Sequence, residues 1–150
     1  MSTIFSDPRQ LQDCELPSVV GQVFETAIGL PTAASDALLP QTPELLTAEI
    51  CLTSNWKAAV RLHCFPGQAR AFASRYLHSP QAAEDVSIAT NTLGEITNLV
   101  AGHLKSVLFS GMEMSTPKIT FGPSQAAGGN LTTQGFTSPD GSFWVSIAEA

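Results

Sequence analysis

Basic residues are scarce in this chain: seven of its 150 residues are Lys or Arg, against thirteen Asp or Glu, which gives a net charge of −6. A protein that binds nucleic acid needs a basic surface to neutralise phosphates, so this balance argues against a nucleic-acid partner. Charged residues of both signs make up 13% of the chain. Because the chain itself is acidic, we expect a protein partner that is basic or that offers a lysine.

Long apolar runs are also missing. No segment approaches the roughly 18 consecutive apolar residues of a membrane helix, which predicts no membrane association. The first ten residues lack the basic and apolar regions of a secretory signal. Cysteines are few and odd in number (Cys14, Cys51 and Cys64), without any Cys-x-x-Cys spacing. Buried thiols in a reducing compartment are the natural interpretation, so the sequence predicts a cytoplasmic protein.

The length is that of one ordinary domain. Residues 1–16 are polar and contain Pro8, so we predict a flexible N-terminal lead-in followed by a single domain over residues 17–150. Within that domain, apolar residues recur at helical spacing from residue 17 or 18 to 28, and a proline-containing loop follows over 31–43.

The remaining elements are indicated by alternation and turn residues. Strands are predicted over 45–53 and 58–65 with a hairpin turn between them, then a short helix over 68–77. Ser79 is a good N-cap and Pro80 suits a first helical position, which predicts one long helix from residue 80 to about 109. Three more strands are predicted at 113–121, 130–137 and 142–148. This order predicts an α+β fold: an antiparallel sheet with helices packed on one face, the long helix carrying the Glu-x-x-Asn motif described next.

The long helix has two contrasting faces at about 100° per residue. One is an apolar stripe that should face the sheet, formed by Ala89, Leu93, Ile96, Val100, Leu104 and Val107. Nearly opposite lie the four residues that we call the polar face: Asn91, Glu95, Asn98 and Gly102. We expect this polar face to be exposed to solvent.

A solvated helix face is usually polar, and a Glu-x-x-Asn pair is a weak signal by itself. However, such a face normally carries more Lys, Arg and Glu than this one, and Lys105 is the only cation near it in the sequence. A flat face rich in amides suits docking against another protein. Small neighbours, Gly94 and Gly102, are expected to allow that partner a close approach.

The segment Leu-Gly-Glu-Ile-Thr-Asn-Leu-Val-Ala-Gly-His-Leu-Lys-Ser, residues 93–106, resembles the signature helix of the CheC/CheX chemotaxis phosphatases, which dephosphorylate receiver domains such as CheY. The early Val-Phe-Glu-Thr helix, the hairpin around Asn55 and Pro117 after the long helix are similar in order. CheC-type members carry two Glu-x-x-Asn helices. Here Glu25 is followed three residues later by Ile28, so the chain resembles the CheX branch, whose members are typically dimers.

The resemblance implies roles for individual residues. Asn98 would orient the water that attacks the aspartyl phosphate of the receiver, and Glu95 would pair with the receiver's active-site lysine. Asn91, Gly94, Gly102 and Lys105 would contact the partner. The chain itself would need no metal or cofactor, because the receiver already holds a Mg²⁺. Asn91 departs from the family pattern, which commonly has Asp or Ser four residues before the glutamate.

Metal and nucleophile sites are less well supported. The histidines His63, His78 and His103 are scattered along the chain and form no cluster of converging ligands, so structural or surface roles are expected. His63 and Cys64 are neighbours on a strand and should point to opposite faces, which argues against a Cys-His dyad.

Three functions therefore remain open from the sequence. The first is a phosphatase acting on a receiver domain, and the second is a catalytically silent module that binds a receiver through the same face. In the third, the polar face is only solvated and the docking surface lies elsewhere. The cognate receiver and the signalling pathway are not specified by the sequence.

Overall fold

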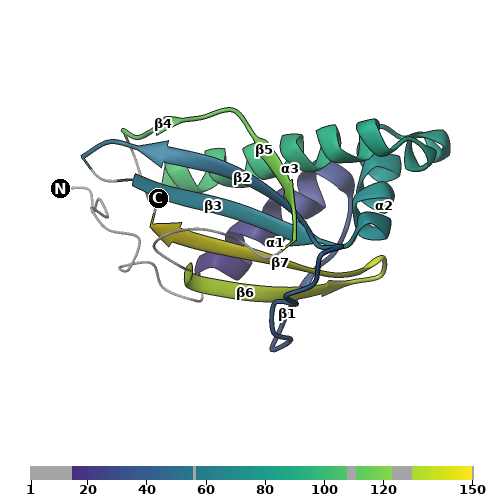
Figure 1. Cartoon of the computed structure of the whole chain (residues 1–150), viewed down its shortest axis with the longest axis horizontal. Coiled ribbons are helices and arrows are strands. Elements are labelled where there is room, and N and C mark those ends of the chain that lie inside the picture. The colour runs from purple at the N-terminus through teal and green to yellow at the C-terminus, as the bar shows by residue number, and fades with distance from the viewer. Residues whose placement is uncertain (1–14, 56, 108–110, 123–129, 150) are drawn as a thin grey trace.

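The structure is a computed structural model of the 150-residue chain, and it describes residues 15–55, 57–107, 111–122 and 130–149 (Figure 1). It is an α+β fold in two layers, with a seven-stranded sheet covered on one face by helices. The predicted fold class is confirmed. The predicted lead-in falls mostly on residues 1–14, which lie outside the described residues.

The helices lie together behind the sheet in Figure 1. The short 3₁₀ helix η2 precedes the longest helix, α3. Their bounds are α1 Glu15–Ile28, α2 Pro66–Tyr76, η2 Pro80–Glu84 and α3 Val86–Val107.

Every strand pairing in the sheet is antiparallel, in the order β1-β6-β7-β3-β2-β4, and β5 also pairs with β2. The central strands β3 and β7 are long and buried, whereas β1, β4 and β5 at the edges are short. The bounds are β1 Ala33–Ser35, β2 Leu46–Thr53, β3 Lys57–Cys64, β4 Glu113–Met114, β5 Lys118–Phe121, β6 Asn130–Ser138 and β7 Gly141–Glu149.

Three predicted boundaries were wrong. Helix α1 already includes Glu15 and Leu16, which lie inside the predicted lead-in, and Leu16 is fully buried in the core. The predicted loop over 31–43 contains β1, whose pairing with β6 depends on a segment a hundred residues away. The strand predicted over 113–121 is split into β4 and β5 around Pro117, which has no N–H to donate to a ladder.

The predicted long helix is also interrupted. Ser79 makes no side-chain capping bond, and η2 ends at Glu84 before α3 begins. Asp85 has an extended backbone, and its Oδ1 accepts hydrogen bonds from the backbone N–H groups of Ser87 (2.8 Å) and Ile88 (3.2 Å). Asp85 therefore caps α3, because it satisfies two donors that no preceding turn could satisfy.

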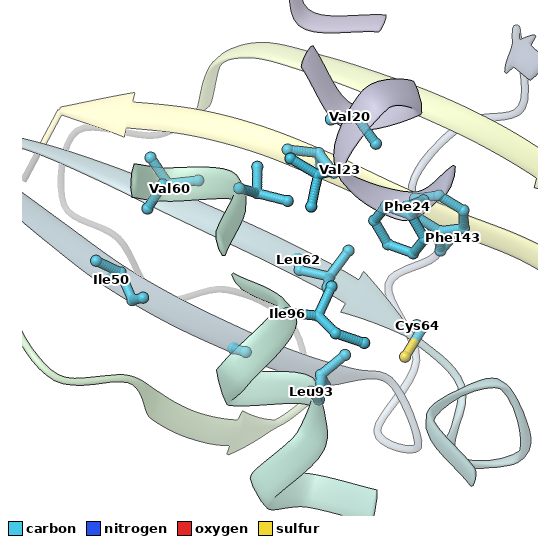
Figure 2. Close-up of a cluster of buried hydrophobic side chains, with 14 of the residues drawn as sticks. Val20, Val23, Phe24, Ile50, Val60, Leu62, Cys64, Leu93, Ile96 and Phe143 are labelled. Atoms are coloured by element: carbon cyan, nitrogen blue, oxygen red, sulfur yellow. The ribbon is translucent and has the colours of Figure 1, made fainter. Parts of the chain in front are cut away.

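The core lies between the sheet and the helices (Figure 2). Leu93 and Ile96 of α3 point toward Leu62 of β3 in this view. Beside them, Phe24 of α1 stacks on Phe143 of β7 with ring centroids 4.5 Å apart. Burial of these apolar side chains is the main stabilising contribution and fixes how α1 and α3 lie on the sheet.

The opposite face of the sheet carries a buried polar group. The His63 ring bridges two hydroxyls: Nδ1 lies 2.8 Å from Thr47 Oγ1, and Nε2 lies 2.8 Å from Ser146 Oγ. Cys64, the next residue, points into the core instead, so the expectation that the two face apart is confirmed. Burial and the nearby charge of Arg61 lower the pKa of His63 to about 4. His63 is thus a neutral structural residue.

We predict that Asp85→Ala lowers the free energy of unfolding by about 1 kcal/mol, because two N–H groups of α3 lose their acceptor. Urea denaturation followed by circular dichroism measures this change. Glu84→Ala is the matched control, since it removes the same charge from an exposed neighbour that does not cap α3. Equal midpoints for the two variants would contradict the capping role.

We predict that acid destabilises the protein through His63. Its folded pKa of about 4 lies below the usual 6.5, so the unfolded chain takes up this proton first as the pH falls. The stability contribution is therefore complete above about pH 6.5 and is lost between there and pH 4, by about 3 kcal/mol in total.

The measurement for His63 is urea unfolding across this pH range, comparing wild type with His63→Gln, whose side chain does not titrate. The difference between the two curves should shrink steadily as the pH falls. An NMR titration of the wild-type ring gives a second test, and a ring that protonates near pH 6.5 without unfolding would contradict the prediction.

Candidate functional site

The site is built on α3, whose two faces are separated as predicted. Five members of the apolar stripe are at most 2% exposed: Ala89, Leu93, Ile96, Val100 and Leu104. The side chain of Val107, the sixth, lies outside what the structure describes. On the polar face, Asn91, Glu95 and Asn98 are exposed and Gly102 is half-buried. The core thus fixes the backbone that carries the Glu-x-x-Asn pair.

Glu95 and Asn98 are chemically available. Their positions three residues apart on a helix place the two side chains on neighbouring turns of one face, with Cβ atoms roughly 5–6 Å apart. Among the described residues, neither side chain makes a hydrogen bond or an ion pair. A carboxylate and an amide that are exposed, adjacent and unpaired are free to bind groups of another molecule.

The backbone beneath the pair is held firmly. Thr97, between the two residues, is fully buried, and its Oγ1 donates a hydrogen bond of 2.7 Å to the carbonyl oxygen of Leu93. Thr92 is also buried, at 3% exposure. Because Thr92 and Thr97 lie inside, the exposed side chains between residues 89 and 100 are only Asn91, Glu95, Asn98 and Leu99.

Gly94 has a different role from the one predicted. It is buried rather than exposed, and a Cβ built there would lie 3.0 Å from Pro117 Cβ, on the segment between β4 and β5. A glycine at this position lets α3 pack closely on the sheet edge within the chain itself. The expectation that Gly94 allows a partner's close approach was therefore wrong, although the small residue does serve a close approach.

The other predicted contact residues lie mostly in the C-terminal half of α3. Lys105 is half-buried and lines a small hollow together with Gly102, Ser106, Gly111 and Met114. A Cβ added at Gly102 would meet no described atom closer than Met114 Sδ, at 3.9 Å, so the surface above it is open. Asn91 is exposed one turn before Glu95.

Helix α1 carries no second pair. Ile28, which occupies the place of an asparagine three residues after Glu25, is 6% exposed and belongs to the core. An asparagine there would have to leave the core to reach a partner. The described residues therefore present a single Glu-x-x-Asn pair, as the sequence predicted.

The sequence reasoning missed a groove of about 520 Å³ between α1 and the C-terminal half of α3, which we call the α1–α3 groove. Its α1 wall includes Val23, Thr26 and Ala27, and its α3 wall includes Asn98, Leu99 and Gly102. One signal was present: Leu99 follows Asn98 and falls outside the apolar stripe. It is 40% exposed, which is high for leucine.

The described residues give little support for a metal site or a cysteine nucleophile. No group of three or more His, Cys, Asp or Glu side chains among the described residues is arranged to hold a metal ion. Cys64 is buried and Cys51 half-buried, both as free thiols, and burial raises the pKa of each. Cys14 lies outside the described residues. Thiols with raised pKa are poor nucleophiles, so neither described cysteine is a candidate.

Within the parts of the chain that the structure describes, no helix combines the length and the apolar character needed to cross a bilayer.

Comparison with known proteins gives a consistent result. The fold is similar to CheX of Vibrio vulnificus (TM-score 0.74, 19% identity, covering 95% of this chain and 99% of that one). It is also similar to CheX of Desulfovibrio desulfuricans (0.69, 14%, 90% and 96%) and to the CheX–CheY–BeF₃–Mg complex of Borrelia burgdorferi (0.63, 16%, 93% and 100%). At these identities the likeness establishes the fold alone.

Sequence comparison is more specific. No characterised protein sequence matches the chain significantly. The profile of the family described as "Chemotaxis phosphatase CheX", however, matches residues 46–139, well over half of the chain and including both Glu95 and Asn98. The chain therefore belongs to the CheX chemotaxis phosphatase family.

Proposed function

We propose that this chain is a phosphatase that hydrolyses the aspartyl phosphate of a CheY-like receiver domain, using Glu95 and Asn98. The observation that carries the proposal is the unpaired, exposed Glu-x-x-Asn pair on a helix whose other face is locked in the core. Membership of a chemotaxis phosphatase family supports the same reaction. A solved complex of a structurally similar CheX with CheY supports the class of partner.

The reaction needs positioning more than reactivity. Water attacks phosphorus, the bond from phosphorus to the aspartate oxygen breaks, and the products are inorganic phosphate and the free carboxylate. Phosphoryl transfer of this kind is accelerated mainly by alignment and by charge stabilisation. The chain therefore needs no nucleophile of its own.

Asn98 supplies the alignment. Its carboxamide oxygen accepts a hydrogen bond from the attacking water and holds it in line with the bond that breaks, as glutamine does in GTPases. An amide is suited to this task because it does not titrate and offers both a donor and an acceptor. A Mg²⁺ belongs in this proposal to the receiver, where it would stabilise the phosphoryl charge.

Glu95 supplies the docking contact. A carboxylate paired with the receiver's lysine forms a charge-assisted hydrogen bond that sets the register between the two proteins. That register determines where Asn98 points. The homodimer expected from the family resemblance remains a prediction for the protein in solution.

We predict that Asn98→Ala lowers kcat at least about a hundredfold, because the attacking water loses its positioning group. The phosphorylated receiver should still bind with little change, since Glu95 remains. The measurement is loss of ³²P from a panel of phosphorylated receiver domains with substoichiometric enzyme, beside a titration with BeF₃⁻-activated receiver.

Asn55→Ala is the matched control, since it removes the same amide from an exposed position in the β2–β3 turn. Glu95→Gln in the same assay should weaken binding, because the shape is kept while the charge is lost. Binding without any turnover by wild type would favour the silent adaptor. Unchanged binding and turnover in both Glu95→Gln and Asn98→Ala would show that the polar face is not the site.

A further inference from the structure

The α1–α3 groove begins at the residue that is proposed to orient the water. Asn98 is part of its wall, and the groove extends from there along the C-terminal half of α3 as far as Ser106. At a rise of 1.5 Å per residue, the eight steps from Asn98 to Ser106 span about 12 Å along the helix axis. The groove and the Glu-x-x-Asn pair are thus one continuous surface.

A receiver seated on Asn98 would cover this groove. A protein–protein interface of standard size covers about 800 Å² on each partner, a patch roughly 30 Å across. A patch of that width centred on Asn98 includes the whole groove. What fills the groove in the complex should therefore come from the receiver itself.

The chemistry of the groove indicates what kind of side chain fits. None of the described residues that line it is Asp, Glu, Lys or Arg, although the chain as a whole has a net charge of −6. Its apolar lining comes from Val23 and Ala27 of α1, Leu99 of α3 and Met114 of β4. The polar side chains that also line it are Gln22, Thr26, Asn98, His103 and Ser106, and Thr26 is exposed. An apolar side chain would bury surface here without leaving a charge unpaired.

The 40% exposure of Leu99 supports the same conclusion. Its apolar side chain lies beside Asn98, and packing against an apolar group of the partner would remove it from water. Contacts near the centre of an interface, shielded from water by their neighbours, contribute more to affinity than contacts at its rim. In the proposed complex, the Glu-x-x-Asn pair contacts only groups that receivers of this class share. Discrimination between receivers therefore requires a second contact.

We propose that the α1–α3 groove binds an aliphatic or aromatic side chain of the receiver, from a segment beside its phosphorylation site, and that this contact selects the cognate receiver. The inference rests on the proposed function, in which Asn98 enters the receiver. It assigns to α1, which lacks a Glu-x-x-Asn pair, the role of a specificity element.

The test fills the groove from α1, by substitutions at positions other than Glu95 and Asn98. Thr26→Trp places a large side chain at the rim, and Ser18→Trp adds the same residue at an exposed position of α1 outside the groove. With the receiver identified by the phosphate-release panel, Thr26→Trp should raise KM at least about tenfold, equivalent to about 1.4 kcal/mol. It should change kcat less than about twofold, and Ser18→Trp should change neither.

A second pair of variants controls for disturbed packing caused by the large Trp side chain. Thr26→Lys and Ser18→Lys each add one flexible charge at an exposed position, and only the first should raise KM. In an NMR titration of the labelled wild-type chain with BeF₃⁻-activated receiver, the amide signals of Thr26, Ala27 and Leu99 should shift together with that of Asn98. Thr26 variants with wild-type KM, or unshifted signals on α1, would overturn the proposal.

The two proposals can fail separately. If Asn98→Ala abolishes turnover but Thr26→Trp binds normally, the phosphatase stands and the groove proposal falls. If no receiver loses phosphate, affinity for the BeF₃⁻-activated receiver decides: weaker binding by Thr26→Trp than by Ser18→Trp supports the groove, and equal binding overturns it. If no receiver of the panel binds, both proposals fail.

Discussion

The packing of the apolar stripe of α3 against the sheet is the constraint on which the rest depends. Leu93, Ile96 and Val100 are at most 1% exposed, so α3 cannot rotate about its axis without exposing them. The helical period then dictates that Glu95 and Asn98 point outward. The same burial that stabilises the fold therefore positions the candidate site, with a rigid backbone and free side chains.

Close packing at the sides of α3 adds to this constraint. Gly94 meets Pro117 at the sheet edge, where a larger residue would push the helix away. On the other side, α3 packs against α1 only in part, and the remaining space is the α1–α3 groove. A surface that is rigid at one side and hollow at the other suits recognition of a folded partner, because little order has to be created on binding.

In the proposed reaction, the catalytic groups are divided between this chain and the receiver, which suits a small acidic protein. Hydrolysis of a phosphorylated aspartate requires a nucleophilic water, charge stabilisation and alignment, and in the proposed reaction the receiver supplies the charge stabilisation. One amide and one carboxylate on this chain are then sufficient. The described thiols, Cys51 and Cys64, and the neutral His63 on the far face of the sheet take no part in that chemistry. Cys64 is explained by packing in the core, and His63 by its two hydrogen bonds.

Local patterns in the sequence determined most of the strands and helices and the outward direction of Glu95 and Asn98, because periodicity depends on neighbouring residues alone. Tertiary structure decided the features that depend on residues distant in the sequence. Strand β1 forms by pairing with β6, and Gly94 packs against Pro117. The cap at Asp85 is local, and the sequence analysis missed it because Ser79 and Pro80 also form a helix-start pattern. The groove beside Asn98 lies between α1 and α3 and depends on how the two helices pack on the sheet, so the sequence carried only one sign of it, the exposed Leu99.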